Sequence, residues 1–180
     1  ENDLRRALGQ NEFTLFYQPK VDMNANVIGM EALIRWQHST LGMVSPDKFI
    51  PMAEKTGIIS PISEWVLHTA CTQIREWQKN HYLSKDATLA VNVSLRQLRQ
   101  ELFWDTLQKI LSVTELDPHC LELELTESSI MDDPQATIAL LEKIHQLGAR
   151  IAIDDFGTGY SSLIYLKRLP IDIIKIDMLF

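Results

Sequence analysis

The stretch LELELTESSIMDDPQATIALLEKIHQLGARIAIDD, residues 121–155, carries the pattern that decides the fold. Apolar residues alternate through Leu121–Thr126 and return in a run at Arg150–Ile153, so both segments predict strands. The segment between them has a helix start, an apolar stripe at helical spacing and a glycine stop: Asp133, Pro134, Ile138, Leu141, Ile144, Leu147 and Gly148. A strand, a helix and a second strand in this order predict a βα unit within a parallel sheet.

The same alternation continues on both sides of this stretch. Apolar runs predict four more strands, at Phe13–Val21, Val27–Trp36, Thr88–Val93 and Ile173–Ile176. Only Asp22–Asn26 separates the first two, which is too short for a crossover helix. These two strands are therefore expected to pair as an antiparallel hairpin.

Helices are predicted between the other strands and at the start of the chain, where residues 1–10 form a charged helix. A short helix is expected at about Ser161–Leu169. Ser94 and Gln97 have the spacing of a capping box, which predicts one helix that carries Leu98, Leu102 and Leu111. The segment 61–79 keeps its apolar residues on one helical face: Ile62, Trp65, Val66, Ala70, Ile74 and Trp77.

These elements favour an α/β fold, a TIM-like (β/α) barrel with an antiparallel N-terminal hairpin. A complete barrel of this kind has eight strands and about 250 residues, whereas this chain has 180 residues. Residues 1–180 are therefore expected to be one domain that is incomplete at the C-terminus, with about two βα units absent.

The composition is that of a soluble globular domain, with 46% hydrophobic and 23% charged residues. The net charge of −7 argues against a protein that follows a nucleic-acid backbone, but it does not exclude a small phosphorylated ligand held by metal ions. Cys71 and Cys120 lack zinc or redox spacing and are expected to be buried, reduced thiols. No apolar run is long enough for a transmembrane segment, so a cytoplasmic location is expected, with any membrane anchor elsewhere in the parent protein.

Polar residues interrupt or follow the predicted strands, and in a parallel barrel the strand ends meet at one face. Any single one of these groups can equally be a satisfied structural residue. Together, however, oxygen ligands without histidine or thiolate favour Mg²⁺ or Mn²⁺, and a cluster of this size can hold two ions for phosphoryl displacement. The set is Glu31, Asn92, Glu124, Asp154, Asp155 and Lys175.

Glycines follow the aspartate pair, at Gly157 and Gly159. A glycine-rich loop after a strand can hold a phosphate, but these two residues alone are a weak sign of it. A loop that positions the acidic pair explains them equally well.

Several short motifs in this order resemble the EAL-domain cyclic-di-GMP phosphodiesterase family. The resemblance covers essentially the whole chain. Its motifs are Tyr17-Gln18-Pro19, Glu31-Ala32-Leu33 with Arg35-Trp36, SPDKFIP at 45–51, Asn92-Val93-Ser94, Glu124-Leu125-Thr126-Glu127, DDFGTGYSSL at 154–163 and Lys175-Ile176-Asp177.

The resemblance implies hydrolysis of one phosphodiester bond of cyclic di-GMP to linear pGpG, with Mg²⁺ or Mn²⁺ as cofactor, in bacterial second-messenger signalling. Lys175 is similar to the lysine beside the attacking water, and Glu127 to the acid that anchors the loop after the fifth strand. Gln18, Leu33 and Arg35 resemble substrate contacts, with Arg35 on a phosphate. The implied metal ligands are Glu31, Asn92, Glu124, Asp154 and Asp155, with Glu31, Asp154 and Lys175 as catalytic residues.

The resemblance also implies a homodimer formed through the complete domain, and fusion to upstream sensory or cyclase domains. The late catalytic glutamate of the family would lie beyond Phe180, so residues 1–180 alone are expected to be inactive. The alternative is a catalytically inactive EAL module that binds cyclic di-GMP or acts as a regulator. The missing glutamate would distinguish the two.

Overall fold

The computed structural model describes residues 2–126, 134–157 and 169–177. A seven-stranded sheet has the order β1-β2-β4-β5-β6-β7, and β3 pairs with β2. The strands are β1 Phe13–Val21, β2 Val27–His38, β3 Gly42–Val44, β4 Thr88–Asn92, β5 Leu121–Thr126, β6 Arg150–Phe156 and β7 Ile173–Ile176. The helices are α1 Asn2–Gly9, α2 Pro46–Thr56, α3 Ile59–Lys79, α4 Leu95–Leu98, α5 Glu101–Thr114 and α7 Pro134–Leu147, with a 3₁₀ turn at Pro118–Cys120.

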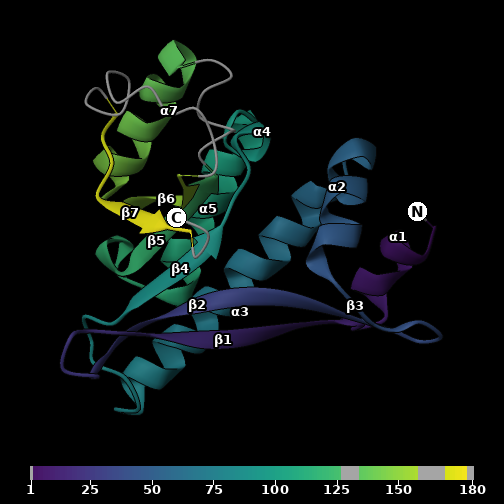
Figure 1. Ribbon diagram of the computed structural model, residues 1–180, viewed down its shortest axis with the longest axis horizontal. Helices are drawn as coiled ribbons and strands as arrows, with labels where there is room; N and C mark the ends of the chain where they lie inside the picture. The colour runs from purple at the N-terminus through teal and green to yellow at the C-terminus, as the bar shows by residue number, and fades with distance from the viewer. Residues whose placement is uncertain (1, 127–133, 158–168, 178–180) are drawn as a thin grey trace.

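The sheet has the arrangement of a TIM-like barrel that is not closed within the described residues. β1 and β2 are antiparallel, as predicted, whereas β2, β4, β5, β6 and β7 are joined by parallel pairings. β1 and β7 stand at the two ends of the pairing order. In Figure 1 the long β1–β2 hairpin runs along one side of the molecule, with α1 and α2 near one end of it.

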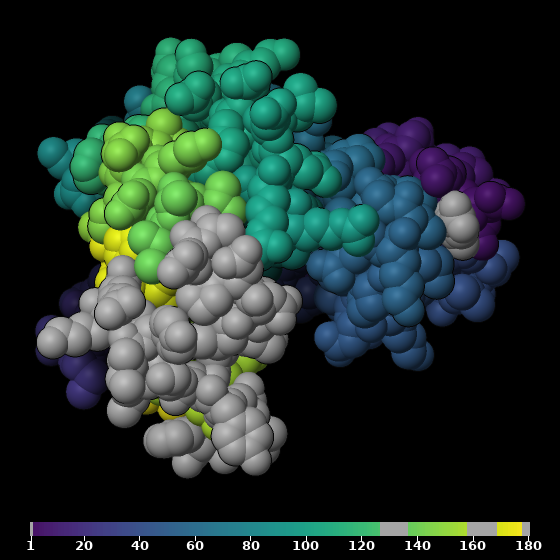
Figure 2. All heavy atoms as spheres, turned by 90° about the horizontal axis from the view of Figure 1, so that it is seen from above, coloured from purple at the N-terminus to yellow at the C-terminus, as the bar shows by residue number. Residues whose placement is uncertain are grey.

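Helix α3 has the apolar face that the sequence predicts. Ile62, Val66, Ala70 and Ile74 are buried in the core, while its two tryptophans are partly buried against it. Helices α1 and α2 belong to a part of the molecule that projects beside the larger body formed by the later elements (Figure 2). This placement matters because α2 and α3 form one wall of the cavity described below.

The helices differ from the prediction in two places. Helix α2 was not predicted, because Pro51 lies inside it and interrupts the helical pattern. The single helix expected after Ser94 is two helices, α4 and α5. The indole of Trp104 donates to the carbonyl of Leu98 at 3.2 Å, which satisfies the end of α4. As a result Leu102 is 76% exposed and does not join the core.

Other expectations agree with the described residues or fall outside them. Cys71 and Cys120 are free, buried thiols, and burial raises the pKa of Cys71 to about 12. Helix α7 is confirmed and Gly148 follows it with φ of 94°, but Asp133 and most of the helix predicted at Ser161–Leu169 lie outside the described residues. Within the described ranges, every helix is too short or too polar to cross a bilayer.

Strand β5 shows how the fold delivers charged groups to the barrel interior. Its leucines and glutamates alternate, and Leu121, Leu123 and Leu125 are fully buried in the core. Glu122 and Glu124 must point to the opposite face, because successive side chains of a strand alternate. Both are only 1% exposed, so this strand places two carboxylates inside the barrel.

Candidate active site

Three carboxylates from three different strands meet in the barrel interior. Glu31 on β2, Glu124 on β5 and Asp154 on β6 each offer an oxygen, and these oxygens lie within 4.8 Å of one another. The three strands are brought together by parallel pairing, in which Asn92 is aligned with Glu124 and Thr126 with Asp154. The side chains therefore converge because neighbouring strands are staggered, as in other barrels.

Lys175 lies at the centre of this group. Its Nζ donates to Glu124 Oε2 at 2.7 Å, to Asp154 Oδ2 at 3.0 Å and to Glu31 Oε2 at 3.3 Å. Burial alone would lower the pKa of this lysine, but its bonds to Glu124 and Asp154 and the charge of Glu31 together raise the pKa above its ordinary value. The three acids thus favour the charged form of Lys175.

Glu124 is the most constrained member of the group. Burial raises the pKa of its carboxyl group to about 7, the bond and charge of Lys175 oppose this, and the charges of Glu31 and Asp154 add to it. Its Oε1 atom is buried and accepts no hydrogen bond from any of the described residues. A buried carboxylate oxygen without a partner is costly, so this atom is suited to a bound cation.

The other two predicted ligands lie beside this cluster. Asn92 Nδ2 donates to Glu31 Oε1 at 3.2 Å, which leaves the carbonyl oxygen of the amide as the atom that could bind a metal. Asp155 is exposed, has φ of 54°, and lies where the pairing of β6 with β7 is irregular. Slight burial and the charges of Asp154 and Asp177 raise its pKa. It does not belong to the group whose ligand oxygens lie within 4.8 Å.

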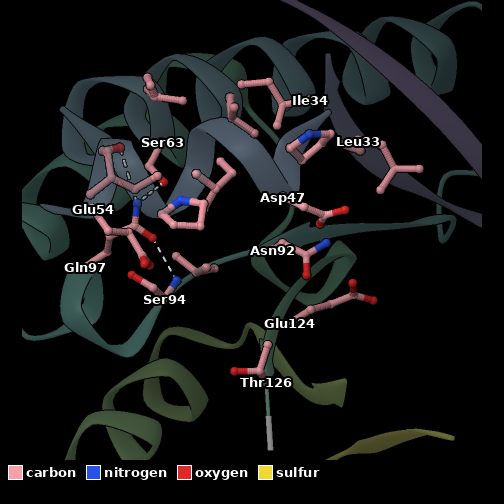
Figure 3. A pocket seen from close by; sticks show the side chains of 18 of the residues that line it. Leu33, Ile34, Asp47, Glu54, Ser63, Asn92, Ser94, Gln97, Glu124 and Thr126 are labelled. Atoms are coloured by element: carbon pink, nitrogen blue, oxygen red, sulfur yellow. Dashed lines mark hydrogen bonds between the residues drawn. The ribbon is translucent and has the colours of Figure 1, made fainter. Parts of the chain in front are cut away.

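A cavity of about 700 Å³ adjoins the acidic cluster. Figure 3 shows Asn92, Glu124 and Thr126 on one side of it and Glu54, Ser63 and Gln97 on another. Its remaining walls come from β2, α2, α3 and the loop before α4 and are largely apolar: Ala32, Leu33, Ile34, Arg35, Pro46, Asp47, Ile50, Pro51, Ile59, Ile62, Val66, Val93 and Ser94. A largely apolar cavity with a small number of polar groups in its walls is typical of a small-molecule site.

The predicted substrate contacts lie along the β1–β2 hairpin. Gln18 is aligned with Glu31 in the antiparallel register, and Leu33 and Arg35 follow on the same face of β2 and line the cavity. The guanidinium of Arg35 donates to the carbonyl of Ile34 at 2.9 Å. The structure thus places all three along one face, next to the acidic cluster.

Two predicted features of the site fall partly or wholly outside the described residues. Glu127, the expected loop anchor, is one of them, and Gly159 is another. Gly157 is described and has φ of 100°, a backbone conformation that favours glycine. It lies two residues after Asp155, in the turn that leaves β6.

Two features of the site region were missed by sequence reasoning. The first is Phe16, which precedes Gln18 by two residues on the same strand and so shares its face. The second is an ion pair inside the barrel between Lys20 on β1 and Glu122 on β5. The two residues of this pair are 102 positions apart in the sequence, so the sequence alone did not bring them together.

A family model described as the EAL domain matches residues 1–180. The chain is an EAL domain. Its residues 31–33 are the Glu-Ala-Leu triplet of that name, and Glu31 is the member of the triplet that joins the carboxylate cluster.

Several relatives of this chain are named as enzymes of cyclic-di-GMP metabolism. It is 47% identical over 177 residues to the bifunctional diguanylate cyclase/cyclic di-GMP phosphodiesterase MucR of Pseudomonas aeruginosa, covering 98% of this chain and 26% of MucR. It is 36% identical over 180 residues to the cyclic di-GMP phosphodiesterase PdeR of Escherichia coli, covering the whole chain and 27% of PdeR. The chain thus spans about a quarter of the length of these two curated relatives.

The fold of this EAL domain is also that of a solved relative. The MucR phosphodiesterase in complex with c-di-GMP matches with a TM-score of 0.92 and 47% identity, over 98% of this chain and 71% of that one. The agreement supports the barrel arrangement of β2 to β7 as a family feature rather than a peculiarity of this sequence.

Proposed function

We propose that this EAL domain acts as a metal-dependent phosphodiesterase that hydrolyses cyclic di-GMP to linear pGpG. One observation carries the proposal: three carboxylates and Lys175 converge beside a cavity, and one buried oxygen of Glu124 has no partner among the described residues. The names of the relatives support the choice of substrate, because several are phosphodiesterases of cyclic di-GMP.

The residues of the cluster fit a hard divalent cation such as Mg²⁺ or Mn²⁺. Carboxylate and amide oxygens are the ligands that these ions prefer, and the cluster contains no sulfur or imidazole. Glu31, Asn92, Glu124 and Asp154 would hold one ion, and Asp155 would contribute to a second. A bound ion would supply Lewis acidity that promotes attack by water and offsets negative charge on the phosphate.

The residues of this chain would then orient the substrate and the water. Lys175 stays protonated and donates hydrogen bonds, so it would hold the attacking water in line with the phosphorus atom. Arg35 would contact a phosphate as a charge-assisted donor, and Gln18 would contact the ligand from the neighbouring strand. Water adds its oxygen to phosphorus and loses a proton, the P–O bond to one ribose breaks, and the released ribose oxygen takes up a proton.

A second candidate function is a module that binds cyclic di-GMP without cleaving it. The observation that favours it is that Lys175 already neutralises part of the carboxylate charge, so the cluster can exist without any metal. In this case the cavity and Arg35 would serve binding alone, and Lys175 would have only a structural role.

A direct assay separates the two candidates. The full-length protein is incubated with cyclic di-GMP and Mn²⁺, and the products are identified by liquid chromatography and mass spectrometry. We expect pGpG to form, and to disappear when Glu124→Gln is assayed under the same conditions. Binding without any cleavage would support the regulatory module, and neither binding nor cleavage would contradict both.

A further inference from the structure

Phe16 lies in the middle of the hairpin face that carries the proposed substrate contacts. In the register of β1 with β2, Gln18 is aligned with Glu31, Phe16 with Leu33 and Thr14 with Arg35. Alternate residues of a strand share a face, so Phe16 is flanked by Gln18 on its own strand and opposed by Leu33. Its side chain is 51% exposed.

The ring of Phe16 contacts the guanidinium group of Arg35. The Cζ atom of Arg35 lies 5.4 Å from the centroid of the ring, which is within the range of a cation–π interaction. Arg35 also donates to the carbonyl of Ile34 at 2.9 Å. The guanidinium carbon thus lies over the aromatic ring, and one guanidinium nitrogen is bound to the backbone.

These two contacts leave the charge of Arg35 available for a ligand. Within the described ranges, no carboxylate forms an ion pair with Arg35, whereas Lys20, Lys79 and Lys175 all have acidic partners. A flexible arginine loses rotamer freedom when it binds a phosphate, and a side chain that is already held loses less. A guanidinium that is held in place by an aromatic ring and a carbonyl is therefore prepared for an anion.

We propose that Phe16 is a positioning residue that holds the guanidinium of Arg35 at the cavity wall, ready to bind a phosphate of the ligand. This inference rests on the proposed function, because it takes a phosphodiester as the ligand of Arg35. Phe16 acts through Arg35 and does not itself contact the reacting atoms. Its ring face, rather than its apolar character, is the property that matters.

A double-mutant cycle tests this inference in the full-length protein, with cyclic di-GMP as the ligand. Phe16→Leu keeps the apolar character and removes the ring face, so KM should rise about two- to fivefold while kcat stays near the wild-type value. Phe16→Tyr keeps the ring and should behave like wild type. In the Arg35→Ala background, Phe16→Leu should cause no further rise in KM. Val21→Ala, at another exposed apolar position of β1, is the matched control.

The outcomes of this cycle have distinct meanings. If Phe16→Leu raises KM equally in the Arg35→Ala background, Phe16 acts on the ligand or the fold directly, and the inference is wrong. If Phe16→Leu changes nothing while Arg35→Ala weakens binding, Phe16 has no positioning role. If the wild-type protein does not bind cyclic di-GMP at all, the proposed function fails, and a measurement without ligand becomes decisive.

That measurement is the mobility of the Arg35 side chain in the free protein, followed by nitrogen relaxation of its Nε after selective labelling of arginine. The order parameter of the Arg35 Nε–H bond should fall in Phe16→Leu and stay unchanged in Phe16→Tyr. An equally ordered guanidinium in wild type and Phe16→Leu would overturn the inference, whatever the ligand is.

Discussion

Among the described residues, two lysines pair with carboxylates inside the barrel, and they differ in the number of carboxylates that they meet. Lys20 on β1 pairs with Glu122 on β5 alone. Lys175 on β7 meets three acids, Glu31, Glu124 and Asp154. The Lys20–Glu122 pair is balanced, with one positive charge against one negative. The group around Lys175 has an excess of acid.

The balanced pair has the character of a structural contact. Glu122 is 1% exposed, and the side chain of Lys20 reaches it past strands β2 and β4, which lie between β1 and β5 in the sheet. Small residues leave room for this: Gly29 is aligned with Lys20, and Ala90 is aligned with Glu122. A side chain could not replace Gly29, because its Cβ would lie 2.3 Å from Thr88 Oγ1 and 2.6 Å from the Thr88 carbonyl oxygen.

The group around Lys175 lacks this balance of charge, which is the feature on which the proposed metal site rests. Three carboxylates around one lysine keep a net negative charge, and the unpartnered Oε1 of Glu124 is part of it. Buried charge of one sign is costly unless a counter-ion joins it. Under the proposed function, the number of charges as well as burial separates the cluster around Lys175 from the Lys20–Glu122 ion pair.

The largest expected effect is the loss of turnover in Lys175→Met. We expect kcat to fall by about 1000-fold, as for the loss of a group that stabilises the transition state. Binding of Mn²⁺, measured by isothermal titration, should be as tight as in wild type or tighter, since Lys175 no longer competes for the carboxylates. Weaker binding of Mn²⁺ by this variant would mean that Lys175 organises the carboxylates instead of competing for them.

Removal of the balanced pair should affect stability instead. Lys20→Met leaves Glu122 buried without a partner, so the free energy of unfolding should fall by roughly 3–5 kcal/mol. The double variant Lys20→Met/Glu122→Leu should recover most of this loss, because no lone charge remains. Denaturant unfolding with and without Mn²⁺ measures both. If Mn²⁺ restores the stability of Lys20→Met, Glu122 itself belongs to a metal site and the Lys20–Glu122 pair is not purely structural.

Arg35 is a third cation, and among the described residues it has no carboxylate partner. Replacing it by alanine should weaken binding of cyclic di-GMP by roughly 1.5–3 kcal/mol, the usual loss for a charged hydrogen bond. The fold and the affinity for Mn²⁺ should not change. Equilibrium binding measures the first and calorimetry the second. Unchanged affinity for cyclic di-GMP would contradict the role of Arg35 as a phosphate contact.

The smallest effect concerns the pH dependence of stability in the metal-free protein. The pKa of Glu124 is raised from 4.5 to about 7, so its neutral form is favoured in the folded state. The resulting stabilisation is complete below pH 4.5 and is lost as the pH rises through 7. With chelator present, Glu124→Gln should therefore unfold at least about 2 °C above wild type at pH 8, and the difference should shrink at pH 5. An equal difference at both pH values would contradict the pKa shift.

The sequence predicts the strands of this barrel better than its helices. The predicted bounds of β1, β5 and β7 agree with the structure, because each is a short run of alternating or continuous apolar residues bounded by polar or turn residues. Helix α2 was missed because Pro51, inside it, interrupts the helical pattern. The break between α4 and α5 depends on the contact of Trp104 with Leu98, which local propensity does not contain.

A similar limit applies to the site. Strand-end polarity placed Glu31, Glu124, Asp154 and Lys175 together, because parallel strands end at one face of a barrel. The contact of Phe16 with Arg35 and the pairing of Lys20 with Glu122 depend on strand register and on which small residues lie between strands. Such information arises only when the strands are assembled.

Titration of the full-length protein with Mn²⁺ tests most directly whether the excess of acid is a cation site. Wild type should bind Mn²⁺, and Glu124→Gln and Asp154→Asn should each weaken binding by at least about 10- to 100-fold. Glu122→Gln, which changes a carboxylate of equal burial on the same strand, should bind Mn²⁺ as wild type does. If Glu124→Gln and Asp154→Asn bind Mn²⁺ as tightly as wild type, the carboxylate cluster is not the metal site, and the difference between the two lysines has another cause.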